Sequence, residues 1–331
     1  MRKASPSHVP GWGSWRACTC LGPPPRQKRE RIAFIGGTSV DIRLVGDTYD
    51  EAAAAASVDA ASSGSLIVPP FDAPEVIAGQ GTVAREIVAQ LGGLPDALLV
   101  PVGGGGLLAG CVSWLDMAER IIGVEPAGAA SMTAALEAGR PVALDDLDGF
   151  VDGAAVRQVG DMTFSIVASS GVPVLAVDEG ALCSEQLAMY QSEGIIAEPA
   201  GALASAALGE VQVRPGSTVV CVVSGGNNDV SRYGEILERS LVHEGLKHYF
   251  LVDFPQEPGA LRRFLDEVLG ADDDITRFEY VKRNNRDTGP ALVGIELSRR
   301  ADLAPLLARI EDSPLQVQHL EPGSPLYSFV H

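Results

Sequence analysis

Four consecutive glycines, Gly103 to Gly106, stand between an apolar run and a second apolar segment that starts at Leu107. The run before them, residues 97–102, is apolar at every position, which predicts a strand buried on both faces of a parallel sheet. The residues after them, 107–118, read as a helix. Glycines at such a junction let several backbone N–H groups converge on one anion at the helix start. The sequence therefore predicts a strand, a phosphate cradle and a helix in succession.

The glycine loop does not match the two common phosphate-binding signatures. It lacks the G-x-G-x-x-G spacing of dinucleotide-binding folds, and no Gly-Lys-Ser/Thr follows it as in a Walker loop. A flexible turn between the strand and the helix is the alternative interpretation, because glycine pairs also mark ordinary turns.

The composition favours a soluble two-domain α/β protein that does not bind polyanions. The 331 residues suffice for two domains, and 46% of them are hydrophobic against 21% charged. The 25 basic and 43 acidic residues give a net charge of -18, which repels nucleic acid and anionic membranes. A small phosphorylated ligand would therefore need local donors such as glycine amides rather than a basic surface.

Cysteine and histidine usage argues against a disulfide framework and against a metal site. The five cysteines are scattered without paired C-x-x-C spacing, which favours a reducing, cytoplasmic location. Four of the five histidines, His243, His248, His319 and His331, lie towards the C-terminus, so we expect neither a histidine base nor a metal triad. We find no signal-peptide core and no apolar stretch of about 18 residues, so we expect no membrane partner.

Helical and strand patterns alternate from Arg26 to Val223, which predicts a doubly wound parallel sheet. Residues 1–25 lack hydrophobic periodicity and are expected to form an irregular arm. A helix stop is expected at Gly36-Gly37, and Thr82 is expected to cap a helix. We expect helices over 27–34, 48–61, 82–91, 107–118, 179–191 and 199–210, and strands over 40–45, 66–68, 97–102, 121–124, 174–177 and 218–223.

The pattern changes after Ser240 to the order β-α-β-β-α-β, which is that of a ferredoxin-like α+β domain. We place the domain boundary near residues 238–246. The expected elements are strands over 248–254, 275–283, 292–297 and 317–320 and helices over 259–269 and 303–311.

Several segments together resemble the pyridoxal-phosphate (PLP) enzymes of fold type II, and in particular the biosynthetic, isoleucine-regulated threonine ammonia-lyases (threonine dehydratases). Each segment is weakly specific, but their order along the chain is specific, and the resemblance extends from about Pro25 to Tyr327. The segments are 25–32, 46–51, 70–72, 78–82, 103–106, 123–126, 150–156, 197–202 and 223–228. The resemblance implies an arm over 1–25, a partial PLP-dependent catalytic domain over 26–240 and an ACT-like regulatory domain over 247–331.

The resemblance gives the candidate cofactor residues their roles. It implies that the backbone amides of Gly103, Gly104, Gly105, Gly106 and Leu107 hold the phosphate of PLP. It also implies that Ser224, directly after a strand, faces the pyridine nitrogen, although a serine that caps the following turn is the alternative. Asp152 and Glu198 lie in segments that are near the cofactor in the family, but their spacing assigns them no role, and capping or ion pairing is the commoner fate of a carboxylate.

The C-terminal segment from Phe254 to Leu261 resembles the ACT-like regulatory domain of the same family. The family role of this domain is to bind isoleucine or valine, which makes Glu257, Gly259, Ala260 and Leu261 candidate effector residues. A glycine turn that opens a helix can offer its amides to a carboxylate. Ferredoxin-like domains also serve as plain oligomerisation units, which is the alternative, and the family precedent is a homo-tetramer.

The covalent chemistry of PLP needs a lysine, and none of the lysines in this chain inherits that role. The chain has only Lys3, Lys28, Lys247 and Lys282, and it lacks the family's Ser-x-Lys segment upstream of the glycine loop. The catalytic Schiff-base lysine is therefore expected to be absent, which is consistent with an N-terminally truncated chain.

The reaction that the resemblance implies is the PLP-dependent deamination of L-threonine to 2-oxobutyrate and ammonia in isoleucine biosynthesis. L-serine is the alternative substrate, and we expect the chain as it stands to be inactive. The first rival is another fold type II enzyme, such as a serine dehydratase or serine racemase. The second is a catalytically dead protein that binds amino acids and regulates a complete subunit.

Overall fold

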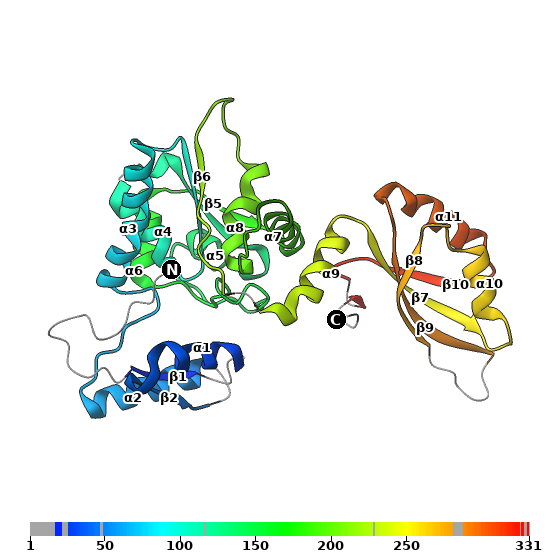
Figure 1. The fold of residues 1–331 in the computed structure, drawn as a ribbon, viewed down its shortest axis with the longest axis horizontal. Helices are drawn as coiled ribbons and strands as arrows, with labels where there is room; N and C mark the ends of the chain where they lie inside the picture. Colours follow the sequence, from blue (N-terminus) through cyan, green and yellow to red (C-terminus); the bar gives the residue numbers. More distant parts are fainter. Residues whose placement is uncertain are drawn as a thin grey trace. The chain divides into compact units, whose positions relative to one another are not determined.

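The computed structural model describes residues 17–21, 26–46, 49–115, 117–227, 229–280, 287–324, 326–327 and 330 (Figure 1). The chain divides into two compact units, residues 1–73 and 74–331. Helix α9, Tyr233–His243, covers the first part of residues 238–246, near which we place the domain boundary.

The first unit contains a pair of parallel strands joined through a helix. Strand β1, Ala17–Leu21, pairs with β2, Val40–Leu44, from Ala17 opposite Val40 to Leu21 opposite Leu44. Helix α1, Arg26–Gly36, lies between them in sequence and ends at the expected glycine pair, and α2, Tyr49–Ser63, follows. Strand β1 corrects the expectation of an irregular arm, because five of its residues join the ladder of β2. Residues 1–16 and 22–25 of that arm lie outside the described residues.

The second unit begins with a four-stranded parallel sheet in the order β5-β4-β3-β6. Strand β3 is buried along its whole length, as its apolar sequence predicts. Chain order runs outward from β3 to β4 and β5 on one side and reaches β6 on the other, which confirms the doubly wound sheet. The strands are β3 (Ala97–Pro101), β4 (Ile121–Pro126), β5 (Val174–Val177) and β6 (Val219–Cys221).

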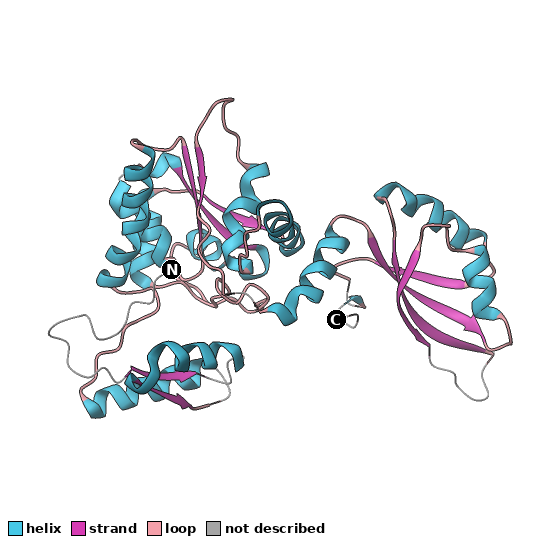
Figure 2. Cartoon of the chain, viewed as in Figure 1, coloured by secondary structure: helices cyan, strands magenta, loops and turns pink. Residues whose placement is uncertain are grey.

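Helices cover both faces of this sheet (Figure 2). Leu98 and Val100 of β3 pack into the core beneath α3, α4, α5 and α6, whereas Ala97 and Leu99 pack into the core beneath α7 and α8. The strand thus contributes alternate residues to two cores. The helices are α3 (Pro74–Leu91), α4 (Gly106–Leu115), α5 (Ser131–Ala138), α6 (Asp161–Ser170), α7 (Glu179–Glu193) and α8 (Pro199–Ala206).

Two local predictions in this region were wrong. Residues 66–68 form no strand, and Leu66 is 90% exposed, so their apolar character does not reflect burial in a sheet. Helix α3 begins at Pro74 rather than at Thr82, because proline suits the first turn of a helix and Glu75 follows it there. Thr82 lies inside the helix, where its hydroxyl donates to the carbonyl of Gly79 at 2.7 Å.

The C-terminal part has the expected ferredoxin-like order. Its antiparallel sheet runs β10-β7-β9-β8, and Phe250, Phe254 and Ile295 of the sheet share a core with Phe264 and Leu306 of the helices. Residues 281–283, expected to end a strand, lie outside the described residues. The elements are β7 (Lys247–Pro255), α10 (Ala260–Glu267), β8 (Asp274–Tyr280), β9 (Thr288–Glu296), α11 (Leu303–Asp312) and β10 (Gln316–Leu320).

Candidate cofactor site

The glycine loop leaves the carboxyl end of β3 and opens helix α4. Gly105 has a φ of 91°, a conformation that residues with a side chain rarely adopt. A Cβ atom on Gly105 would lie 2.7 Å from Met132 Cε and 3.0 Å from Thr163 Cβ. The first helical hydrogen bond follows at once, from the amide of Ala109 to the carbonyl of Gly105 at 2.8 Å. Position 105 therefore requires glycine both for its backbone angle and for its space.

Thr163, a fully buried residue of α6, holds the loop in place. Its hydroxyl donates to the carbonyl of Gly104 at 2.7 Å, and the amide of Gly160 lies 3.5 Å from the same oxygen. The hydrogen bond joins residues 59 positions apart in sequence, so no local sequence pattern predicts it. Thr163 is therefore not predictable as a site residue from the sequence.

A second segment, residues 148–154, closes against the glycine loop. A Cβ atom on Gly103 would lie 3.0 Å from the Cα of Ala154, so the two backbones are in contact. Phe150, Val151 and Ala154 are all at most 4% exposed, which anchors the segment to the protein core. We call residues 148–154 the wall segment.

Ser224 follows β6, the strand next to β3, and it meets the start of α8. Its hydroxyl donates to the carbonyl of Ala200 at 3.3 Å. The amide of Glu198 donates to the carbonyl of Gly225 at 3.1 Å, and a Cβ atom on Gly225 would overlap the Glu198 carboxylate. The same carboxylate oxygen lies 3.4 Å from the Cβ position of Gly153. Glu198 thus lies where the segment after β6 meets the wall segment.

The topology explains why these segments meet. Strands β3 and β6 are parallel neighbours, with Leu99 opposite Cys221, and the chain order reverses between them. Ligands of doubly wound sheets bind outside the carboxyl ends of the strands at such a reversal. The structure therefore brings the predicted glycines, at the end of β3, and Ser224, at the end of β6, to one edge of the sheet. Leu107 lies in the first turn of α4 and is partly buried.

Asp152 and Glu198, to which the sequence assigns no role, have different surroundings. Asp152 lies 3.9 Å from the guanidinium of Arg232 and is partly exposed, which agrees with the alternative of ion pairing. Glu198 occupies the N-cap position of α8, but its side chain makes no capping hydrogen bond.

A third carboxylate, Glu125 of β4, is fully buried near the loop and was not singled out from the sequence. It accepts hydrogen bonds from the amides of Met132 at 2.9 Å and Thr133 at 2.8 Å, at the start of α5. Burial raises the pKa of this carboxyl group, and the hydrogen bonds at Thr133 and Met132 oppose the shift. Glu125 therefore fixes α5, which carries Met132 against Gly105. The available signal was its place in the 123–126 segment of the resemblance.

The candidate effector residues lie apart from this site, in the C-terminal domain. Gly259 precedes α10 with a φ of 90°, and no described atom lies within 4 Å of its Cβ position. The carboxylate of Glu257 forms an ion pair with Arg263. Ala260 is 7% exposed, whereas Leu261 is 41% exposed.

The loop fits the phosphate end of PLP, because it is a glycine cradle at a helix start that a side chain would fill. A lysine opposite the cradle is not identified. Lys247 has a described side chain, and it is paired with Glu238 in the C-terminal part. The side chains of Lys3, Lys28 and Lys282 lie outside the described residues.

Within the described parts of the chain, no group of histidine, cysteine and acidic side chains could hold a metal ion. The same parts contain no helix with the length and apolarity needed to cross a bilayer. Cys111 and Cys183 are free and buried, and burial raises their thiol pKa values to about 11 and about 12. Neither thiol is therefore activated as a nucleophile.

Comparison with known proteins identifies the family of the chain. A family model described as pyridoxal-phosphate dependent enzyme matches residues 17–225, which starts inside the arm expected to lie outside the resemblance. A model of the C-terminal regulatory domain of threonine dehydratase matches residues 238–330.

Individual relatives are biosynthetic L-threonine dehydratases. L-threonine dehydratase biosynthetic IlvA of Mycobacterium tuberculosis is 60% identical over 330 residues, covering 95% of this chain and 76% of that protein. Its Bacillus subtilis counterpart is 47% identical over 308 residues, covering 92% of this chain and 73% of that protein.

Solved structures share the fold. Processed threonine deaminase isoform 2 of Solanum lycopersicum superposes with a TM-score of 0.60 at 35% identity, covering 67% of this chain and 65% of that one. Maize serine racemase superposes with a TM-score of 0.58 at 26% identity, covering 68% of this chain and 70% of that one. The chain therefore belongs to the pyridoxal-phosphate dependent enzymes and, within them, to the family of biosynthetic threonine dehydratases with a C-terminal regulatory domain.

Proposed function

We propose that this chain binds PLP at the glycine loop and takes L-threonine as the amino acid of its site. The observation that carries the proposal is the glycine loop Gly103–Gly106 at the end of β3, where the chain order of the sheet reverses, with Ser224 after the adjacent strand β6. The identity of 60% to L-threonine dehydratase of Mycobacterium tuberculosis supports L-threonine over L-serine.

In this proposal the cradle binds the phosphate through the amides of Gly103–Gly106 and Leu107, aided by the dipole of α4. Ser224 follows the adjacent strand and offers a neutral hydroxyl to the pyridine nitrogen, with its proton turning there from the Ala200 carbonyl. When bound, PLP supplies an electron sink for charge that develops at the α-carbon of the substrate. A neutral partner at the ring nitrogen moderates that electron withdrawal, which favours elimination over transamination.

The chain is further proposed to hold PLP without a covalent bond to lysine. Its four lysines all lie outside the segments that form the cradle and its walls. The family reaction, which releases 2-oxobutyrate and ammonia, should then be absent from this chain alone. A base that takes the α-proton from the substrate would be missing along with the covalent anchor.

Equilibrium titration of the purified chain with PLP, followed by cofactor fluorescence, tests the binding proposal. We expect saturable binding that competes with inorganic phosphate, together with no release of 2-oxobutyrate from L-threonine. The matched variants are Gly105→Ala, which fills the cradle, and Gly92→Ala, a glycine with a φ of 69° outside the site. Equal PLP affinity of the two variants would rule out the cradle as the phosphate site.

The rival function is a catalytically silent protein that binds isoleucine or valine and regulates a complete enzyme. The completeness of the ferredoxin-like sheet, with all four strands paired, favours it. The open position at Gly259, before α10, makes Glu257, Gly259, Ala260 and Leu261 the proposed effector residues. Calorimetric titration with isoleucine and with valine tests this, and no heat with either amino acid would contradict it.

We also propose a cytoplasmic location and a homo-oligomer, for which the family precedent is a tetramer. The three described cysteines are free, and the net charge of -18 disfavours nucleic acid as a partner. Light scattering during size-exclusion chromatography measures the mass directly. A monomer of 34.5 kDa at micromolar concentration would contradict the oligomer.

A further inference from the structure

Helix α9, Tyr233–His243, has polar contacts on two sides, and the first side holds the wall segment. Arg239 pairs with Asp148 at 3.2 Å, and its guanidinium carbon lies 4.1 Å from the ring centroid of Phe150. Arg232, just before the helix, donates to the carbonyl of Phe150 at 2.7 Å and lies 4.7 Å from the same ring. Phe150 is thus contacted by two guanidinium groups, both carried by α9 or the turn before it.

The wall segment is in direct contact with the glycine cradle. Ala154 meets Gly103 backbone to backbone, and Gly153 approaches Glu198 and Ala200. A change in the position of Phe150 must therefore move atoms that touch the cradle, because buried packing leaves little room for independent adjustment.

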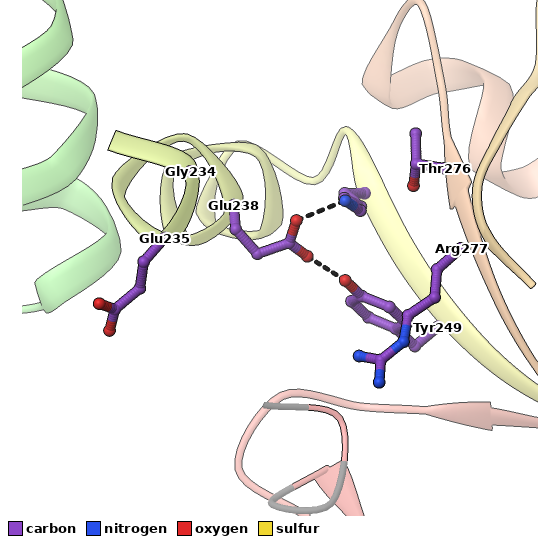
Figure 3. A pocket seen from close by; sticks show the side chains of 7 residues that line it. Gly234, Glu235, Glu238, Tyr249, Thr276 and Arg277 are labelled. Atoms are coloured by element: carbon purple, nitrogen blue, oxygen red, sulfur yellow. Dashed lines mark hydrogen bonds and ion pairs between the residues drawn. The ribbon is translucent and has the colours of Figure 1, made fainter. Parts of the chain in front are cut away.

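The second side of α9 is tied to the C-terminal sheet through one carboxylate. Glu238 accepts hydrogen bonds from Lys247 Nζ and from the hydroxyl of Tyr249, both in β7 (Figure 3). The side chains of Glu238 and Lys247 are 18% and 9% exposed, so the pair is largely shielded from water. Breaking such a shielded pair by removing one partner is more disruptive than breaking a surface ion pair.

A pocket of about 510 Å³ lies beside this contact and adjoins Gly234 and Glu235 of α9 and Thr276 and Arg277 of β8. In Figure 3 the Glu238 side chain reaches Tyr249 from α9, while Arg277 extends from β8. The space between α9 and the C-terminal sheet is thus partly open here. The hydrogen bonds of Glu238 to Lys247 and Tyr249 connect the helix to β7 at this place.

We propose that α9 couples the C-terminal domain to the glycine cradle, with Glu238 as the positioning residue on one side and Arg239 on the other. A movement of β7 displaces Glu238 and, with it, helix α9. The displacement of α9 shifts Arg232 and Arg239. These two side chains then move the wall segment relative to Gly103. The cofactor part of this inference rests on the proposed function, whereas the mechanical coupling does not.

Hydrogen exchange of the full chain, read by mass spectrometry, tests the coupling without any ligand. Glu238→Gln keeps the shape and removes the charge, so we expect exchange to rise about fivefold in segments 103–107 and 148–154. The matched control is Asp302→Asn, which removes a C-terminal ion pair with Arg299 from a side chain that is 23% exposed. Unchanged exchange in both segments in Glu238→Gln, or the same rise in Asp302→Asn, would overturn the proposal.

Two further variants separate coupling from general destabilisation. Tyr249→Phe removes one of the two hydrogen bonds to Glu238, so its effect should fall in the same segments and be smaller. In an Arg239→Gln background, Glu238→Gln should add little to the exchange of segment 148–154, because the path is already broken. A full additional effect there would contradict transmission through Arg239.

Titration with PLP distinguishes this inference from the proposed function. If both hold, Glu238→Gln weakens PLP binding about fivefold, whereas Asp302→Asn does not. If the wild-type chain binds no PLP, the proposed function fails, and the exchange data still decide the coupling.

Discussion

Both the backbone angle and the crowded surroundings of position 105 require glycine. Its φ of 91° disfavours any L side chain, and its Cβ position is already occupied by Met132 and Thr163. We expect Gly105→Ala to lower the free energy of unfolding by about 3 kcal/mol, the sum of left-handed backbone strain and overpacking. Gly92→Ala introduces the backbone strain without overpacking, so it should lower the free energy of unfolding by about 1 kcal/mol. Urea denaturation of both variants measures the difference, and equal losses would show that the cradle is not tightly packed.

Thr163 supplies a second test at the residue scale. Thr163→Val keeps the shape but removes the donor to the Gly104 carbonyl, so we expect a loss of about 1 to 3 kcal/mol in unfolding free energy. Weaker PLP binding should accompany it. The control is Ser169→Ala, an exposed residue of the same helix whose hydroxyl also bonds a backbone carbonyl, and its effect should stay within about 0.5 kcal/mol. A neutral Thr163→Val would mean that the loop does not depend on this hydrogen bond.

At the scale of elements, α3 and α4 cross in backbone contact. A Cβ atom on Gly81 would lie 2.7 Å from the carbonyl oxygen of Gly110, whereas Gly79, two residues earlier in α3, has no described atom within 4 Å. Gly81→Ala should therefore separate the helices and lower the thermal midpoint. Gly79→Ala should raise it, because alanine favours a helix by about 0.5 to 1 kcal/mol over glycine. Midpoints that shift in the same direction would contradict the close crossing.

The pairing of β7 with β10 should make the C-terminal domain sensitive to acid. His248 and His319 lie 5.3 Å apart, and burial lowers the pKa of both, with the charge of His248 adding to the effect at His319. The unfolded chain then takes up protons at a higher pH than the folded chain. Stability is therefore lost as the pH falls through about 6.5, the unfolded value.

Thermal midpoints at pH 7.5 and pH 5.5 measure this effect. His319→Phe keeps the stacking on Phe250 and removes one titrating group, so its midpoint should change less between the two conditions. A midpoint that changes as much as in the wild-type chain would show that His319 does not contribute.

Elements and site differ in how far the sequence predicts them. Strand β3 and the glycine loop were predictable because a buried strand must be apolar and a crowded turn needs glycine. Strand β1 was missed, since pairing with β2 rather than local periodicity places it. Thr163 and the contacts of α9 escaped prediction because their partners are distant in sequence, as Arg239 and Asp148 are. Local constraints on backbone and burial can be read from the sequence, whereas contacts between distant segments cannot.

In the whole molecule, a glycine loop at the edge of a parallel sheet is followed in the chain by a ferredoxin-like regulatory domain. The two parts meet through α9, whose Arg239 holds the wall segment and whose Glu238 holds β7. The same chain has four lysines, none of them in a segment that forms the cradle or its walls. We therefore propose that the chain binds PLP through its phosphate and does not hold it covalently.

Borohydride treatment of the PLP-loaded full chain, with peptide mapping by mass spectrometry, tests this claim most directly. Borohydride makes any bond between the cofactor and a lysine permanent. We predict reversible PLP binding in which all cofactor is released on denaturation, and no lysine labelled above the level of a denatured control. Stoichiometric label on Lys3, Lys28, Lys247 or Lys282 would contradict the account.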